Sequence, residues 1–183
     1  MKKLKLSLLL FIAVFLYGCA SGAQFKNMAY TETSGFEYDN ALKNNVGVPH
    51  VTGGEKTNPL WTSEISSEAF QEAIKLSLSS KGLLSESARY QLKVTLLEVE
   101  QPLFGLDIKV TTHVNYVLTD TVTNKVILND LVVAPYTATV GDAFVAIKRL
   151  RLANEGAGRS NIEAFLIRLS ALKINAKDIS LAK

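Results

Sequence analysis

Residues 106–118 are Leu106-Asp107-Ile108-Lys109-Val110-Thr111-Thr112-His113-Val114-Asn115-Tyr116-Val117-Leu118, and apolar side chains occupy nearly every second position. The positions between them hold polar residues, among them Asp107, Lys109 and His113. This two-residue period predicts a strand with one face against a core and the other toward water. We therefore expect a long, half-buried strand at the centre of the fold.

The flanking segments continue the same pattern. Upstream, residues 90–96 alternate in the same way and predict another strand. Downstream, residues 120–124 favour a hairpin turn in which Asn124 takes a left-handed conformation. Residues 125–139 then predict a further strand, with room for a bulge. These three strands are expected to form an antiparallel meander.

A short strand and a helix are expected before the meander. The strand covers Val46–Thr52 and leads into a turn-rich stretch. Either Ser63 or Ser66 is a suitable cap for a helix that runs to about Lys81, where Gly82 stops it.

A long helix is expected after the meander, with Asp142 as its cap. Positions 18 residues apart fall on one line of a helix, and Phe144 and Ile162 are such a pair. The apolar phase survives the intervening glycines, which favours one helix of about 30 residues, roughly 45 Å long. A break near Gly158, with Ser160 capping a second helix, is the alternative.

The order of elements is thus strand, helix, three strands and a long helix. Amphipathic helices must cover the apolar face of a sheet. We therefore predict an α+β fold, a two-layer sandwich in which a mostly antiparallel four-stranded sheet (β-α-β-β-β-α) is covered by two helices. Residues 46–183 are expected to form this single domain.

The N-terminus has the pattern of a secretory signal. Lys2, Lys3 and Lys5 precede an apolar run, Leu6–Leu16, that is too short to span a bilayer. Residues 1–18 are therefore expected to be a signal peptide. Its removal also removes those three lysines and leaves 17 basic against 17 acidic residues, a neutral balance that does not support nucleic-acid binding.

The end of this signal, Leu16-Tyr17-Gly18-Cys19, resembles the lipobox of bacterial lipoproteins, although Tyr17 is bulkier than the residue usual there. The resemblance implies that Cys19 is acylated, as by palmitate, and becomes the membrane-anchored first residue. Cys19 is the single cysteine of the chain, so no disulfide is expected. The alternative is an ordinary cleaved signal with an incidental cysteine.

The residues after Cys19 bear on sorting and on the tether. By the same resemblance, Ala20 and Ser21 in place of Asp imply export to the outer membrane of a Gram-negative cell, with the domain facing the periplasm. Residues 19–45 show no clear periodicity and are expected to be a lipidated N-terminus and tether. Part of it, Phe36–Tyr38, could pack on the domain surface.

The order of elements behind a lipobox resembles small outer-membrane lipoproteins with α/β sandwich domains. These include the lipopolysaccharide-assembly lipoprotein that sits inside a barrel and the auxiliary lipoproteins of lipid-transport systems. The resemblance rests on element order and on the lipobox. It implies an accessory role and transfers no binding motif.

Catalytic and metal motifs do not fit this sequence. Gly53-Gly54-Glu55-Lys56-Thr57 lacks the adjacent Gly and Lys of a phosphate loop, and Gly156-Ala157-Gly158 lacks the third glycine of a dinucleotide fingerprint. His50 and His113 lie on different strands without a second ligand at metal spacing. We expect a non-enzymatic protein without cofactor or metal.

One candidate partner surface is the face of the sheet that the helices leave uncovered. Several apolar residues fall out of phase with the helix-facing set or extend it, and they are Leu97, Val99, Val117, Ile127, Leu131 and Val133. If they are exposed, they form an apolar patch for a protein or lipid partner. Alternatively, bulges return them to the core, or residues 20–45 cover them.

A second candidate is a set of polar residues on the apolar stripe of the long helix, namely Arg151, Asn154 and Asn161. Buried polar groups need partners, so these side chains either contact loop carbonyls and nearby Glu155 and Glu163 or bind another protein.

The leading hypothesis is an accessory or scaffold lipoprotein that docks onto another component of the outer membrane or periplasm. Its partners would be the membrane, through the acyl chains of Cys19, and an envelope protein. The alternative is a carrier that holds a lipid or other apolar ligand between sheet and helices.

Overall fold

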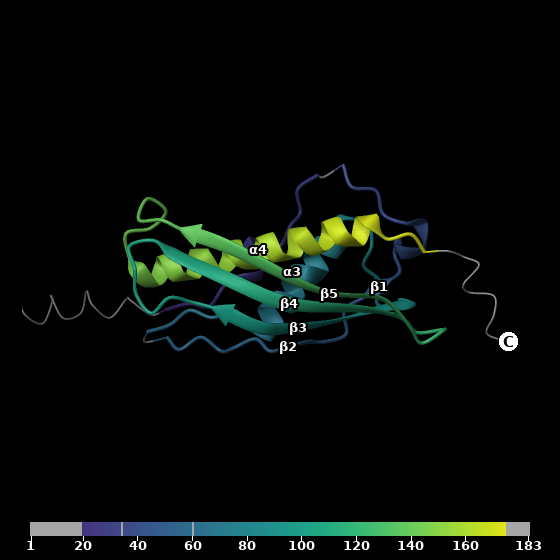
Figure 1. The fold of residues 1–183 in the computed structure, drawn as a ribbon, viewed down its shortest axis with the longest axis horizontal. Coiled ribbons are helices and arrows are strands. Elements are labelled where there is room, and N and C mark those ends of the chain that lie inside the picture. Colours follow the sequence, from purple (N-terminus) through teal and green to yellow (C-terminus); the bar gives the residue numbers. More distant parts are fainter. Residues whose placement is uncertain (1–19, 34, 60, 175–183) are drawn as a thin grey trace, which may run out of the picture.

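The computed structural model describes residues 20–33, 35–59 and 61–174, and it has a helix layer on one face of a sheet (Figure 1). Three long strands, β3 (Tyr90–Glu100), β4 (Ile108–Asp120) and β5 (Lys125–Ala138), form the predicted antiparallel meander. The predicted α+β class is confirmed.

The alternation in β4 determines which face of the sheet is buried. Ile108, Val110 and Tyr116 face the helices and are at most 4% exposed. Leu106 was assigned to this strand by its phase, but it precedes β4 and is exposed. The hairpin is closed by Asn124, whose φ of 55° is the left-handed conformation expected of it.

Two short strands complete the sheet at the outer edge of β3. β1 (Val46–Gly47) and β2 (Val51–Thr52) both pair with β3 in parallel, so the sheet is mixed and has five strands. One continuous strand was predicted here. Pro49 lies between the two, and a proline has no N–H to donate to a ladder.

The first long helix, α3 (Ser67–Ser80), begins at Ser66, whose hydroxyl accepts the N–H of Ala69 at 3.1 Å. Of the two caps proposed, Ser66 is therefore the one used. The helix ends before Gly82, which has a φ of +66° and is the left-handed residue that commonly terminates a helix.

The C-terminal helix, α4 (Ala146–Ala171), is continuous, as the apolar phase predicted. Its start was predicted wrongly. Asp142 does not cap it, because its carboxylate accepts the backbone N–H and the hydroxyl of Thr139 in the preceding turn. Phe144, placed on the buried stripe by phase, lies before the helix and is 89% exposed.

The two glycines inside α4 are explained by close packing. A Cβ at Gly156 would lie 2.3 Å from the ring of Tyr136 on β5, and a Cβ at Gly158 would lie 2.9 Å from Sδ of Met28. A helical glycine costs about 1 kcal/mol relative to alanine. Here the absence of side chains at the two glycines lets Tyr136 of β5 and Met28 pack directly on the helix.

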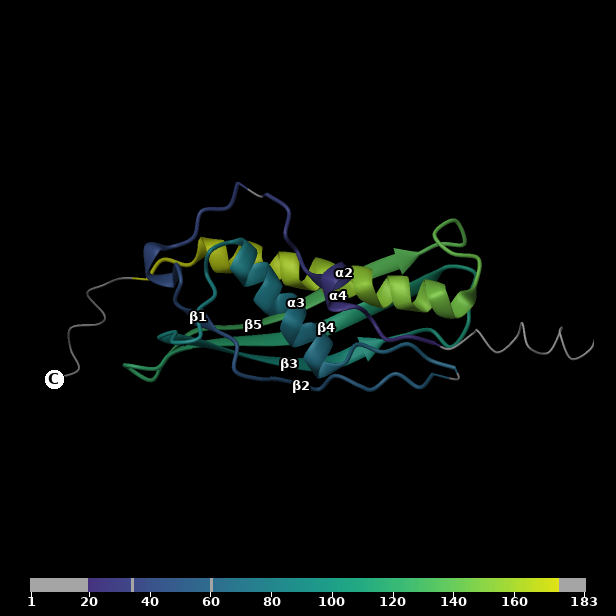
Figure 2. The same ribbon diagram turned by 180° about the vertical axis from the view of Figure 1, so that it is seen from behind.

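Residues 20–33 and 35–45 belong to the domain, which corrects the predicted tether. They include α2 (Phe25–Met28), which lies across α3 and α4 (Figure 2), and a 3-10 turn, η2 (Asn40–Leu42). Met28 and Leu42 are fully buried in the main core. This segment has no periodicity because it is held by contacts to distant residues rather than by an amphipathic stripe.

No helix within the described residues is both long and apolar enough to cross a membrane.

Candidate functional site

The sheet face opposite the helices, here called the outer face, is turned toward the viewer in Figure 1. On β5 it carries Leu131 and Val133, which are 46% and 49% exposed. Val117 on β4 belongs to the same face and is half-buried. Asn115 pairs with Leu131 and His113 with Val133, so polar residues lie directly beside the apolar ones.

Two residues predicted for this face turn into the core instead. The register shifts between Leu118 and Thr119, opposite Ile127, and again between Leu96 and Glu98. Ile127, at the first irregularity, and Val99, just after the second, both pack against buried core residues. A bulge inserts one residue and reverses the face on which later side chains lie. Ile127 is thereby removed from the candidate partner surface.

Asn161 is fully buried and therefore offers no surface to a partner. Its amide donates to the carbonyl oxygens of Thr112 and Val132 at 3.1 and 3.0 Å, and its carbonyl accepts the hydroxyl of Tyr116 at 2.8 Å. Burial raises the pKa of Tyr116, so its hydroxyl keeps the proton that it donates. The residue joins α4 to the sheet.

Asn154 is likewise fully buried. It donates to the carbonyl of Ser63 at 2.7 Å and accepts from the side-chain amide of Gln101 at 3.0 Å. Arg151 lies nearer the surface, donates to the hydroxyl of Ser21 at 2.6 Å and lies 3.7 Å from the Glu155 carboxylate. These contacts match the alternative in which loop carbonyls and Glu155 are the partners of the polar side chains on the stripe of α4.

A cluster that the sequence analysis missed lies on the outer face. Ligand atoms of Glu98, Glu100 and His113 all lie within 4.8 Å of one another. Glu98 comes beside His113 because of the bulge before it, which a strict two-residue period does not predict. The carboxylates are exposed, and His113 is already paired with Glu100 at 3.1 Å. The cluster is explained by this pair.

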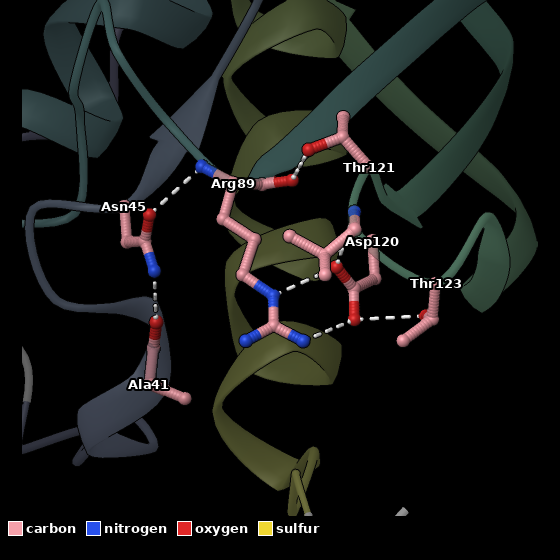
Figure 3. Close-up of polar contacts among 7 residues, drawn as sticks. Ala41, Asn45, Arg89, Asp120, Thr121 and Thr123 are labelled. Atoms are coloured by element: carbon pink, nitrogen blue, oxygen red, sulfur yellow. Dashed lines mark hydrogen bonds and ion pairs between the residues drawn. The ribbon is translucent and has the colours of Figure 1, made fainter. Parts of the chain in front are cut away.

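The far end of the sheet is held by an ion pair between Arg89 and Asp120 (Figure 3). Arg89 donates two hydrogen bonds to the Asp120 carboxylate, at 2.7 and 2.6 Å. Asp120 also accepts the Thr123 hydroxyl, and Asn45 accepts the N–H of Arg89 (Figure 3). The guanidinium holds the pKa of Asp120 well below its usual range. Asp107 lies at the opposite end of β4, so the two carboxylates do not form a pair.

A groove of about 520 Å³ opens beside α4. Glu155, Arg159 and Glu163 line it together with Asp142. An acyl chain needs an apolar lining. The four charged side chains therefore make this groove a poor site for an acyl chain.

Cys19 lies outside the described residues, but the next residue, Ala20, is held in the domain. The N–H of Ala20 donates to the carbonyl of Pro59 at 2.8 Å, and Ala20 is 8% exposed. Ser21 is held by the Ser63 hydroxyl, which donates to the Ser21 carbonyl at 2.8 Å. The described chain therefore begins as an integral part of the domain.

No family model and no curated protein matches this sequence. Solved structures do match. A protein of Xanthomonas campestris assigned to family DUF330 aligns with a TM-score of 0.54 and 10% identity, over 78% of this chain and 94% of that one. A hypothetical protein of Chlamydia trachomatis aligns with a TM-score of 0.52 and 12% identity, over 71% and 97%.

The fold is shared. A minor lipoprotein of Acinetobacter baumannii aligns more loosely, with a TM-score of 0.48 and 11% identity over 70% of this chain and 94% of that one. For the Xanthomonas and Chlamydia proteins the likeness extends to the order and packing of helices and strands.

Proposed function

We propose that this chain is a non-enzymatic lipoprotein of the Gram-negative outer membrane, anchored through acylated Cys19 and facing the periplasm. Its domain acts as an accessory or scaffold that docks onto another envelope protein, as the sequence resemblance to assembly and transport lipoproteins implies. Asn154 and Asn161, considered above as partner-binding residues, are engaged in holding the fold together.

The observation that carries the proposal is the position of Ala20. The lipobox places a lipid on the residue before it, and Ala20 is built into the domain by its bond to Pro59. A lipid on Cys19 would therefore hold this domain close to a membrane. Such an address suits a protein that works beside membrane-bound partners.

The outer face supplies the docking surface in this proposal. It has no helix over it among the described residues, and Leu131 and Val133 project from β5 with about half of their surfaces exposed. Exposed apolar side chains ringed by polar ones are typical of surfaces that bind another protein. The carrier alternative has no comparable observation in its favour.

The test is crosslinking in intact cells with the full lipidated chain. A photoreactive side chain at Leu131 should capture one defined envelope protein. The double variant Leu131→Asp with Val133→Asp should lose that protein on co-purification. The control is Thr137→Asp, which puts one such charge on the outer face of the same strand.

Circular dichroism of both variants shows whether the domain has folded. If the double variant folds and retains its partner in full, the outer face is not the docking surface. If no partner is captured from any position on this face, the scaffold role is wrong.

A further inference from the structure

The most exposed large apolar side chains gather at one end of the molecule. Among the described residues, those at least 80% exposed are Leu103, Phe104, Leu106 and Phe144. Three lie in the β3–β4 loop and one in the β5–α4 loop, and both loops lie at the left end of Figure 1. We call these four residues the apolar tip.

The two loops of the apolar tip are fastened to each other. Arg149, which is 5% exposed, donates to the carbonyls of Ala143 and Phe144 at 2.8 and 2.7 Å and reaches the carbonyl of Gly105 at 3.4 Å. The carboxylate of Asp107 accepts the N–H of Val140 at 3.3 Å. The apolar side chains are therefore presented together on a braced surface.

The described chain begins at this same end (Figures 1 and 2). Arg151, in the second turn of α4, donates to the Ser21 hydroxyl, and Gln101, the first residue of the β3–β4 loop, donates to the carbonyl of Ser63 at 3.1 Å. Consecutive Cα atoms are about 3.8 Å apart. An acyl group on Cys19 would therefore be attached one residue away from Ala20, which is held in the domain. No tether would separate the lipid from the domain.

Trp61 lies close to this starting point. It is 69% exposed and stands two residues after Pro59, the residue that accepts the N–H of Ala20. Tryptophan is enriched at membrane interfaces because its ring is apolar and its N–H is polar.

We infer that the apolar tip and Trp61 insert into the interfacial layer of the bilayer that carries the Cys19 acyl chains. The inference rests on the proposed acylation of Cys19. An anchor without a tether brings this end of the domain to the membrane. The most exposed large apolar side chains lie at this same end, and their transfer from water to the bilayer is favourable. A second copy of the chain would cover the same surface, but the position of Ala20, next to the proposed lipid on Cys19, favours the bilayer.

The test uses Trp61, the single tryptophan of the chain, as a depth probe. Mature lipidated protein is reconstituted in vesicles of phosphatidylethanolamine and phosphatidylglycerol, with or without brominated acyl chains, which quench tryptophan on contact. Side chains of interfacial segments lie roughly 5–10 Å into the headgroup and acyl boundary. We therefore expect Trp61 emission to be quenched several-fold by the brominated lipid.

The matched control is Trp61→Phe combined with Val122→Trp. Val122 is 64% exposed and lies in the β4–β5 hairpin at the opposite end of the sheet. Its tryptophan should show little quenching, whereas Phe144→Trp in the same background should be quenched as Trp61 is. Equal quenching at positions 61, 122 and 144, or none at 61 and 144, would overturn the inference.

Two further readouts separate the other outcomes. Intact mass shows whether Cys19 is acylated, so a chain without acyl groups contradicts the proposed function, whereas an acylated chain with an unquenched tip contradicts only this inference. Self-association in vesicles that shields Trp61 from brominated lipid would assign the apolar tip to a second copy and likewise overturn the bilayer contact.

Discussion

The two ends of β4 differ in how they are stabilised. At Asp120 the chain is locked by an ion pair, a hairpin and bonds from Thr123 and Val122, and the carboxylate is 3% exposed. At Ile108, about 40 Å away along the strand, the loops expose large apolar side chains. Beneath those loops lies a separate small core that includes Ile108, Val110 and Ala157.

This difference indicates a division of work within one domain. At the Asp120 end the polar groups are paired with one another within the domain, so substitutions there should lower its stability. The apolar tip is braced by Arg149 but buries little of its own apolar surface, so changes at its side chains should affect binding and leave stability nearly unchanged. The predictions below test that contrast.

The largest effect is expected for Asp120→Ala. It leaves Arg89 without its carboxylate in a site that is only a quarter exposed, and such a loss costs about 3 kcal/mol of unfolding free energy. Urea unfolding of the full chain in detergent, followed by circular dichroism, measures it. Asp107→Ala at the other end of β4 is the control, since that carboxylate is exposed, and it should cost far less. Equal losses at both positions would remove the contrast.

A smaller loss is expected for Arg149→Met. The methionine keeps much of the volume but gives up the bonds to Ala143, Phe144 and Gly105, which should cost about 2 kcal/mol. Amide exchange should rise selectively in residues 101–107 and 139–145, while residues 120–124 stay protected. A uniform rise across the domain would show that Arg149 supports the whole fold rather than the tip.

The ion pair should also show in the pH dependence. Because Arg89 lowers the pKa of folded Asp120, the pair stabilises the fold fully above the unfolded value of about 3.9, and this contribution is lost as the pH falls below it. The stability difference between the wild type and Asp120→Asn should therefore be constant near neutral pH and shrink below about pH 4. A difference that grows on acidification would contradict the assignment.

The smallest effect on stability is expected at the apolar tip. Leu103→Ser and Phe144→Ser remove side chains that are already in water, so unfolding free energy should change by no more than about 0.5 kcal/mol. A loss of several kcal/mol in urea unfolding would mean that these side chains belong to the core.

Local patterns in the sequence predicted the centre of this fold. The period of residues 108–118 identified the buried face of β4, and Asn124 took the left-handed conformation that its small polar side chain tolerates. The continuous helix α4 followed from its apolar phase despite Gly156 and Gly158.

Features that depend on irregularity or on distant contacts were missed. Ile127 was assigned to the outer face because a two-residue period cannot show where a bulge falls. Residues 20–45 have no period of their own, and Met28 is buried against α4 at a point where Gly158, far along the chain, leaves room for its side chain. The apolar tip was missed because Phe144 was counted as part of a helix that begins two residues later.

The central claim, that a lipid on Cys19 holds this domain directly against a membrane, is tested most directly at the N-terminus of the mature protein. Mass spectrometry of the chain purified from cell membranes should show residues 1–18 removed and acyl groups on Cys19. A mature chain with a free Cys19 thiol, or one that starts at another residue, would contradict the account.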